Sequence, residues 1–324
     1  MSEIQTSVQT LQVVVTRVRQ EAHGIRLFQV EPLGGATLPA FTAGSHIDVH
    51  LAPGLTRQYS LCGDPAERAF YEFAVQLEAA SRGGSQALHQ QVMAGSRLTI
   101  STPRNFFALN AKAPRHLLMA GGIGVTPMVS MLHELERNGA EYELHYCTRS
   151  PERTAFRRHL LPRVEAGRVH LHHDGGDPAK SLAMGPLLLR QPAGTHLYYC
   201  GPSGFMAAVA QASNGWPREA VHCEYFVAPD KSATDKKDEP FVVRLARSGR
   251  CLEVPADRSI MDVLADHGVA VQSSCRAGYC GSCITRYVAG EPEHRDAVLD
   301  DSDRSQYVLV CCARSRSKEL VLDL

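Results

Sequence analysis

The sequence predicts a multidomain protein of α/β and β class: an antiparallel β-barrel, then a doubly wound parallel sheet, then a small β-grasp sheet around one helix. Three observations carry this prediction. The 324 residues exceed one ordinary domain. The apolar pattern changes from strand-like to alternating strand and helix, and a polar segment sets off the last part of the chain. We expect three domains, at 1–110, 111–227 and 240–324, with a linker at 228–239.

Residues 1–110 alternate apolar and polar side chains as strands do. In "SHIDVHL", Ile47, Val49 and Leu51 point to one face, with polar residues between them. Turn signals such as "LGG", "APG" and "AGS" separate these runs. Strands punctuated in this way are typical of an antiparallel barrel.

Residues 111–227 alternate short apolar strands with helical stretches. "HLLMA" leads into "GGIGVTPMVSMLHELERNG", and "THLYYCGPSGFMAAVAQA" repeats the arrangement. This alternation predicts a parallel, doubly wound sheet. In such sheets, ligands bind outside the carboxyl ends of the strands.

The polar segment "APDKSATDKKDE" at 228–239 is nearly free of large apolar residues and is typical of a linker. Beyond it, "PFVVRLARSGRCLEVPAD" predicts a hairpin. "SIMDVLADHG" predicts a helix with Ser259 as N-cap and Gly268 as the C′ residue. "ELVLDL" is the expected last strand.

The composition excludes several classes of function. The 34 basic and 34 acidic residues balance, so no overall positive field would hold nucleic acid. No apolar run reaches the ~18 residues of a membrane-spanning helix, and "MSEIQTSVQT" lacks the pattern of a signal peptide. Ten cysteines without an export signal indicate reduced thiols and a metal or cluster site. We expect a cytoplasmic protein with no membrane partner.

Three cysteines in "SCRAGYCGSC" are spaced as Cys275-x4-Cys280-x2-Cys283. A structural zinc site would need a second pair of ligands, which this segment does not supply. This spacing, followed by one distant cysteine, is the plant-type pattern for a [2Fe–2S] cluster. Cys311 and Cys312 in "YVLVCCARS" both qualify as the distant ligand. If that segment is a strand, the two point to opposite faces and only one reaches the cluster, but periodicity does not say which.

Two glycine-rich segments follow strands of the parallel sheet. "AGGIGVTPM" supplies Gly121, Gly122 and Gly124 at the start of a helix, with Thr126 suited to the N-cap and Pro127 to the first helical position. It is not the usual G-x-G-x-x-G fingerprint, and a plain glycine-rich turn is an equal alternative for this motif alone. "YCGPSGFM" is the second segment, and two such strand ends are what a bound dinucleotide needs; its residues are Cys200, Gly201 and Pro202.

Other polar segments suggest contacts with the same kind of ligand. "YCTRS" ends a strand, so Thr148, Arg149 and Ser150 could reach a ribose or phosphate, although Arg149 also fits a plain surface arginine. In the barrel, "RQYS" offers a face for a planar ligand and "SRGGSQALH" an anion site before a helix. Each of the two also fits an ordinary barrel turn. The residues concerned are Arg57, Tyr59, Ser60, Arg82, Gly83, Gly84 and Ser85.

The segment "VHLHHDGG" raises the alternative of a metal-binding protein, because alternation puts His170 and His172 on one face. A strand that ends near a ligand site is the favoured interpretation. Asp174, at the end of that strand, then approaches a ribose.

Taken together, Arg-x-Tyr-Ser, Arg-Gly-Gly-Ser, Gly-Gly-Ile-Gly-Val-Thr-Pro-Met and Cys-Gly-Pro resemble the ferredoxin–NADP reductase superfamily. With "PRNFFAL" and a C-terminal plant-type ferredoxin domain, the chain is similar end to end to the phthalate dioxygenase reductase and vanillate O-demethylase reductase family.

This resemblance implies three cofactors: FMN, NADH and a [2Fe–2S] cluster. The implied FMN residues are Arg57, Tyr59, Ser60, Ala74, Val75, Arg82, Gly83, Gly84 and Ser85, with Thr126 and Phe226 flanking the flavin ring. The implied NADH residues are Gly121, Gly122, Gly124, Thr148, Arg149, Cys200, Gly201 and Pro202. The implied cluster ligands are Cys275, Cys280, Cys283 and Cys311; Cys312 stands where the family usually has another residue.

The resemblance implies an NADH-dependent flavin iron–sulfur oxidoreductase, the reductase component of a Rieske-type aromatic oxygenase or O-demethylase. A flavin accepts a hydride and releases single electrons, so it connects NADH with the cluster without a catalytic side chain. Plant-type clusters lie near −400 mV and Rieske centres between roughly −150 and +300 mV, so transfer to a Rieske oxygenase is downhill.

The alternative is an NAD(P)H-dependent flavin and iron–sulfur reductase for a separate ferredoxin or a non-aromatic monooxygenase. A self-contained monooxygenase would need a haem or iron domain, for which no residues remain, and a simple electron carrier would lack the nucleotide-binding half. We expect a monomer.

Overall fold

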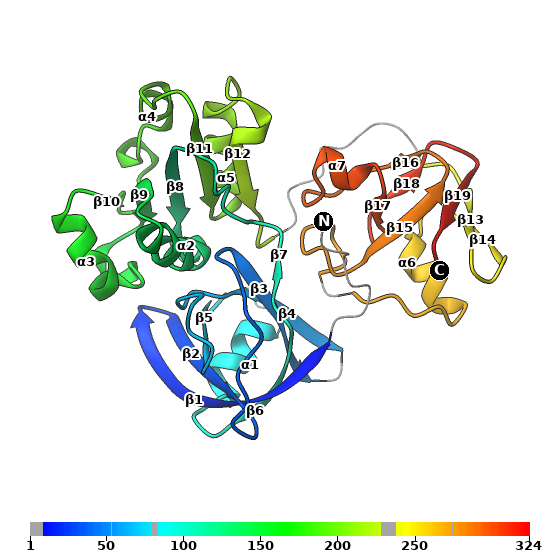
Figure 1. The fold of residues 1–324 in the computed structure, drawn as a ribbon, viewed down its shortest axis with the longest axis horizontal. Coiled ribbons are helices and arrows are strands. Elements are labelled where there is room, and N and C mark those ends of the chain that lie inside the picture. Colours follow the sequence, from blue (N-terminus) through cyan, green and yellow to red (C-terminus); the bar gives the residue numbers. More distant parts are fainter. Residues whose placement is uncertain (1–8, 53, 80–82, 228–237, 274) are drawn as a thin grey trace. The chain divides into compact units, whose positions relative to one another are not determined.

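The computed structural model describes residues 9–52, 54–79, 83–227, 238–273 and 275–324 (Figure 1). Contacts divide these residues into an N-terminal unit, Thr10–Phe226, and a C-terminal unit that contains 238–324. The two units are described separately below.

The first part of the N-terminal unit is an antiparallel sheet in the order β4-β3-β6-β1-β2-β5, with β7 paired to β3. A bridge between Leu61 and Phe73 connects the two ends of this order and closes the barrel. Ile47 and Val49 are fully buried inside it, as the alternation in their strand predicts. The strands are β1 (Thr10–Ala22), β2 (Ile25–Pro32), β3 (Ser45–Ala52), β4 (Leu55–Ser60), β5 (Tyr71–Gln76), β6 (Arg97–Ser101) and β7 (Arg104–Asn105); α1 spans Gly84–Gln91.

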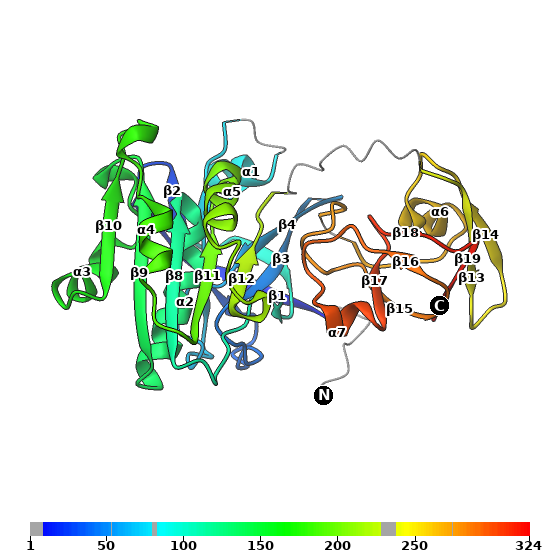
Figure 2. The same ribbon diagram turned by 90° about the horizontal axis from the view of Figure 1, so that it is seen from above.

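The second part is a parallel sheet in the order β10-β9-β8-β11-β12, which Figure 2 shows from one side to the other. Its strands are β8 (Arg115–Gly121), β9 (Glu141–Thr148), β10 (Val169–His173), β11 (Thr195–Cys200) and β12 (Val221–Glu224). Four helices connect them: α2 (Val125–Arg137), α3 (Arg157–Glu165), α4 (Met184–Leu189) and α5 (Ser203–Ala212).

Helices cover both faces of this parallel sheet because its strands carry apolar residues on both sides. Leu118 and Leu144 pack with residues of α2 and α3 on one face. Leu117 and Met119 pack with residues of α4 and α5 on the other. The sheet is therefore doubly wound, as predicted.

The start of α2 differs from the expectation that Thr126 is its N-cap. A single 3₁₀ turn, Gly122–Gly124, runs directly into the helix, so Gly124 is the N-cap and Thr126 is already the second helical residue. The Thr126 hydroxyl donates to the Ile123 carbonyl oxygen at 3.0 Å inside this turn. The correction follows from the glycines, which let the chain turn before the threonine is reached.

The C-terminal unit is a five-stranded sheet in the order β14-β13-β19-β15-β17 around one buried helix, α6 (Ile260–Asp266). Ser259 caps α6 by accepting from the Asp262 amide at 3.1 Å, and Gly268 has φ 72°, so both predicted caps are confirmed. The other elements are β13 (Phe241–Leu245), β14 (Cys251–Val254), β15 (Ile284–Ala289), β16 (Pro292–Glu293), α7 (Asp301–Arg304), β17 (Tyr307–Leu309), β18 (Arg314–Ser315) and β19 (Glu319–Leu322).

These three main sheets, with the two-stranded sheet β16-β18, confirm the predicted fold class, multidomain α/β and β. Among the described residues, each helix is too short or too polar to cross a lipid bilayer.

Candidate functional site

The three-cysteine loop lies between α6 and β15, and its backbone is folded around the sulfur atoms. The amide of Cys275 donates to Cys280 Sγ at 3.5 Å, and the amide of Ala277 donates to Cys275 Sγ at 3.4 Å. Gly278 has φ 79°, and a Cβ atom there would lie 2.7 Å from Cys312 Sγ. Glycine is therefore required both by the backbone angle and by the nearby sulfur.

Cys311 and Cys312 do not lie on a strand. The alternation of strand side chains therefore does not apply to them. Strand β17 ends at Leu309, and both cysteines occupy the turn that follows. In this turn the Cys312 thiol donates to the Leu309 carbonyl oxygen at 3.6 Å. Cys311 forms side-chain hydrogen bonds with Cys283 and with Cys312, and these lower the pKa of Cys311 to about 4.

The donor set fits an iron–sulfur cluster, because thiolates are the ligands such clusters take. A hydrogen bond with Cys280 lowers the pKa of the Cys275 thiol to about 6, although the negative charge of Cys311 raises it in part. Cys275, Cys280, Cys283 and Cys311 thus interact with one another through hydrogen bonds and charge. This arrangement favours Cys311 as the fourth thiol.

The two glycine-rich strand ends of the parallel sheet touch each other. A Cβ atom on Gly124 would overlap the carbonyl of Cys200, and one on Gly121 would lie 2.9 Å from Pro202 Cδ. Gly201 approaches the Gly121 backbone just as closely, since a Cβ on Gly201 would lie 3.0 Å from Gly121 Cα. The structure therefore brings the two predicted nucleotide-binding segments together at the carboxyl ends of β8 and β11.

The polar residues after β9 and β10 are held within their own loops. The Thr148 hydroxyl bonds Thr154 Oγ1 and His173 Nδ1, each at 2.9 Å. Asp174 accepts from the Gly176 amide at 2.7 Å, and its other oxygen accepts from Ser181 at 3.4 Å. Arg149 is exposed directly after β9. Of these residues, Arg149 has the side chain most open to a ligand.

In the barrel, the predicted phosphate-binding residues meet at the N-terminus of α1. Gly83, with φ 90°, is its N-cap, and a Cβ on Gly84 would lie 3.0 Å from Arg57 Nε. The N-terminus of a helix carries partial positive charge that favours anions, and an arginine beside it adds positive charge. Ser85 Oγ accepts from the Glu78 amide at 3.2 Å. Arg82 lies outside the described residues.

The barrel also presents a surface toward the nucleotide-binding strand ends. Tyr59 is partly buried and packs against the barrel core, where its ring stacks on that of Phe73 with centroids 5.5 Å apart. A Cβ on Gly122 would lie 4.0 Å from Gln76 Oε1, so the end of β5 faces the 3₁₀ turn that follows β8. Ala74 is buried, and Phe226 packs against the same apolar cluster. Val75 is buried within the barrel core instead.

Sequence reasoning missed Glu224, which joins the barrel to the parallel sheet. Glu224 lies at the end of β12, opposite Cys200, and its Oε2 accepts from the Ser60 hydroxyl at 3.0 Å. His46 Nδ1 lies 3.7 Å from its Oε1. Burial raises the pKa of the Glu224 carboxyl to about 7. The available signal was an acidic residue between the apolar strand and Phe226 in "CEYF".

Comparison with known proteins identifies the family. Residues 243–316 match the 2Fe-2S iron-sulfur cluster binding domain. The chain is 45% identical to the tert-butanol monooxygenase / tert-amyl alcohol desaturase reductase subunit of Aquincola tertiaricarbonis, over 95% of each chain. It is 42% identical to a vanillate O-demethylase oxidoreductase of a Pseudomonas species, over 97% of this chain and 100% of the other.

A solved phthalate dioxygenase reductase, described as a modular structure for electron transfer from pyridine nucleotides to [2Fe–2S], is 40% identical to this chain. It superposes with a TM-score of 0.71 and covers 97% of this chain and 98% of its own. The chain belongs to this family of oxygenase reductase subunits.

The predicted resemblance, the oxidoreductase class and the role as a reductase subunit of an oxygenase or demethylase system are thereby confirmed. This reductase passes electrons from a pyridine nucleotide to a [2Fe–2S] cluster. Its partner belongs to the class of oxygenase components.

Gly124→Ala tests the contact between the two strand ends. The added methyl group overlaps the Cys200 carbonyl, so the turn after β8 and the end of β11 must move apart. This movement would distort the predicted nucleotide-binding segments. We expect kcat/KM for the reduced nucleotide, measured with an artificial electron acceptor, to fall roughly tenfold or more. Gly204→Ala is the matched control, because no atom lies within 4 Å of its added Cβ. An unchanged kcat/KM in a folded Gly124→Ala protein would contradict the assignment.

Glu224→Gln tests the buried carboxyl. Its pKa in the folded protein, about 7, exceeds the ordinary 4.5. The protonated group therefore contributes stability that is present below pH 4.5 and lost as the pH rises through 7. We expect the free energy of unfolding of the glutamine variant, relative to the wild type, to be higher at pH 8 than at pH 5 by up to roughly 3 kcal/mol. Denaturation at the two pH values measures this difference. The exposed Glu219→Gln should show no such gain. An equal difference at both pH values would refute the shift.

Proposed function

We propose that the reductase takes electrons from NADH, passes them through FMN and its [2Fe–2S] cluster, and delivers them to a Rieske-type oxygenase. One observation carries most of this proposal: the glycine-rich strand ends, the barrel strand β4 and Glu224 are joined within one unit. A hydride donor and a flavin must meet face to face, and this junction joins a nucleotide cradle to a barrel surface.

The proposed flavin residues divide into two groups by what they contact. We propose that one group holds a phosphate at the N-terminus of α1, which the contact between Gly84 and Arg57 supports. This group is Arg57, Gly83, Gly84 and Ser85, with Arg82 outside the described residues. Tyr59, Ser60, Ala74, Val75, Thr126 and Phe226 are proposed to surround the ring. Bound FMN would supply hydride acceptance and single-electron release. The Ser60 hydroxyl, held by Glu224, is then the group positioned to hydrogen-bond the ring edge.

FMN is proposed over FAD for two reasons. The proposed phosphate site is closed by the start of α1 at Gly83 and Gly84. The sequence also offers no obvious aromatic side chain on which an adenine could stack. Arg149 and Ser150 could also bind the 2′-phosphate of NADPH. The choice of NADH over NADPH therefore rests on the family resemblance. The proposed NADH residues are Gly121, Gly122, Gly124, Thr148, Arg149, Cys200, Gly201 and Pro202. For Thr148 the contact would come from its backbone, because its hydroxyl is engaged within its loop.

The acceptor is proposed to be a Rieske oxygenase because a plant-type cluster has the potential to reduce one, by a drop of roughly 250 mV or more. The family resemblance favours an aromatic acid or aryl ether as the oxygenase substrate. The similarity to the reductase subunit for tert-butanol favours a non-aromatic monooxygenase as a second candidate acceptor. The residues proposed for all three sites come from one chain, which supports a working monomer.

The cofactor identities are tested on the purified protein. Heat-released flavin should co-elute with FMN, because the site closes at the first phosphate, and kcat/KM should be higher for NADH than for NADPH. Chromatography against flavin standards and steady-state kinetics check the two expectations. Recovery of FAD as the dominant flavin would overturn the first, and a tenfold preference for NADPH would overturn the second.

Replacing the fourth thiol separates Cys311 from Cys312. We propose Cys275, Cys280, Cys283 and Cys311 as the cluster ligands, supported by the hydrogen bond between Cys283 and Cys311. Cys311→Ser should lose the reduced-state EPR signal of the cluster and cytochrome c reduction, while NADH still reduces the flavin. Cys312→Ser is the matched control and should keep all three. An intact signal in Cys311→Ser together with its loss in Cys312→Ser would reverse the assignment.

A further inference from the structure

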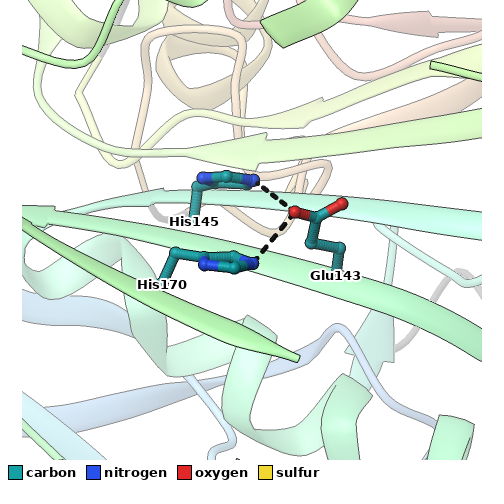
Figure 3. Close-up of side chains that lie close together, drawn as sticks. All are labelled: Glu143, His145 and His170. Carbon is teal, nitrogen blue, oxygen red and sulfur yellow. Dashed lines mark hydrogen bonds and ion pairs between the residues drawn. The ribbon is translucent and has the colours of Figure 1, made fainter. Parts of the chain in front are cut away.

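A cluster of imidazole and carboxylate groups lies on β9 and β10, away from the strand ends described above. Glu143 and His145 alternate along β9, and His170 and His172 along β10. The parallel register places His170 beside His145, so these side chains share one face of the sheet. Figure 3 shows three of them converging: Glu143, His145 and His170.

The convergence is on a single atom. His145 Nε2 and His170 Nε2 each lie 3.0 Å from the same carboxylate oxygen, Glu143 Oε1. The two rings are nearly parallel, with centroids 4.7 Å apart. One ligand atom from each of the three residues lies within 4.8 Å of the other two. Ligand atoms around a tetrahedral zinc ion are separated by about 3.3 Å, so small side-chain rotations would place all three around one ion.

Neighbouring groups hold these side chains in the orientation that a metal ion requires. His172 Nε2 lies 3.0 Å from His145 Nδ1, so it can accept the Nδ1 proton and leave the His145 Nε2 lone pair for a metal. Such a second hydrogen bond is the usual support for a metal-binding histidine. Arg115 donates to the other oxygen of Glu143 at 3.0 Å. Arg115 also lies 3.5 Å from Glu141, whose negative charge offsets that of the guanidinium.

The cluster is accessible from one side. The side chain of His145 is only 7% exposed and that of Glu143 20%, whereas that of His170 is 39% exposed. An ion bound there would be shielded by the sheet and open to water at one position. The pairing also joins β10, the edge strand of the sheet, to its neighbour β9.

We propose that Glu143, His145 and His170 bind one Zn²⁺ ion through Oε1 and two Nε2 atoms, with water as the fourth ligand. Two imidazoles and a carboxylate form a donor set that suits zinc, and three protein ligands leave one position open. The ion would replace the two hydrogen bonds to Oε1 and would fasten the edge strand β10 to β9. This site shares no residue with the cluster thiols or with the glycine-rich strand ends of β8 and β11.

The test is Zn²⁺ binding to the intact holoprotein, measured in competition with a chromophoric chelator. The flavin and cluster absorbance should stay unchanged, which shows that the added zinc has not displaced iron. We expect one Zn²⁺ per chain and a zinc X-ray absorption edge with nitrogen and oxygen neighbours only. Zinc should also raise the thermal unfolding midpoint, because it binds only the folded site.

Variants assign the ligands. His145→Ala, His170→Ala and the nearly isosteric Glu143→Gln should each weaken Zn²⁺ binding at least tenfold and abolish the rise in unfolding midpoint. His196→Ala is the matched control: its ring also pairs with another imidazole, that of His222, at 3.0 Å, and it should leave Zn²⁺ binding unchanged. Glu143→Gln keeps the proposal testable if a histidine variant fails to fold.

Three results would overturn the proposal. The first is a holoprotein that binds no Zn²⁺ in the competition assay, which would leave the cluster as a hydrogen-bonded network only. The second is sulfur in the zinc coordination shell, which would place the ion at cysteines. The third is a loss of binding in His196→Ala equal to that in His170→Ala, which would indicate unspecific binding to paired histidines.

Discussion

The backbone contact between Gly124 and Cys200 is the constraint on which the nucleotide-binding region depends. A Cβ atom on Gly124 would overlap the Cys200 carbonyl, so the turn that follows β8 lies directly against the end of β11. Cys200 stands in register with Glu224 on the neighbouring strand β12. This pairing of β11 with β12 places the Glu224 carboxyl beside Ser60, and their hydrogen bond joins the sheet to the barrel.

That junction explains why a buried carboxyl is tolerated there. An isolated charged carboxylate is costly to bury, and this cost raises the pKa of Glu224 to about 7. The Ser60 hydroxyl offsets part of the cost, because it donates a hydrogen bond to the carboxylate. The C-terminal unit meets a comparable problem with sulfur. The thiols of the three-cysteine loop and of the turn after β17 hydrogen-bond one another, which lowers the pKa of Cys275 and Cys311.

Periodicity and turn residues were sufficient to predict the three sheets and the caps of α6, because those features are set by neighbours along the chain. The details that failed depend on a few residues or on tertiary contacts. Thr126 looked like an N-cap, but the preceding glycines start the helix earlier. Alternation could not separate Cys311 from Cys312, because β17 ends before either. Glu224 was missed since its partner Ser60 is distant in sequence.

The most direct test of the electron path is an anaerobic rapid-mixing experiment in which the oxidised reductase meets NADH. Flavin absorbance and the EPR signal of the cluster are followed in the same reaction. In the proposed path, electrons enter at the strand ends of β8 and β11 and leave through the cluster bound by Cys275, Cys280, Cys283 and Cys311. The flavin absorbance must then be bleached first, at a rate that rises with NADH concentration. The EPR signal of the cluster must follow. A cluster that becomes reduced without prior bleaching of the flavin would contradict this path.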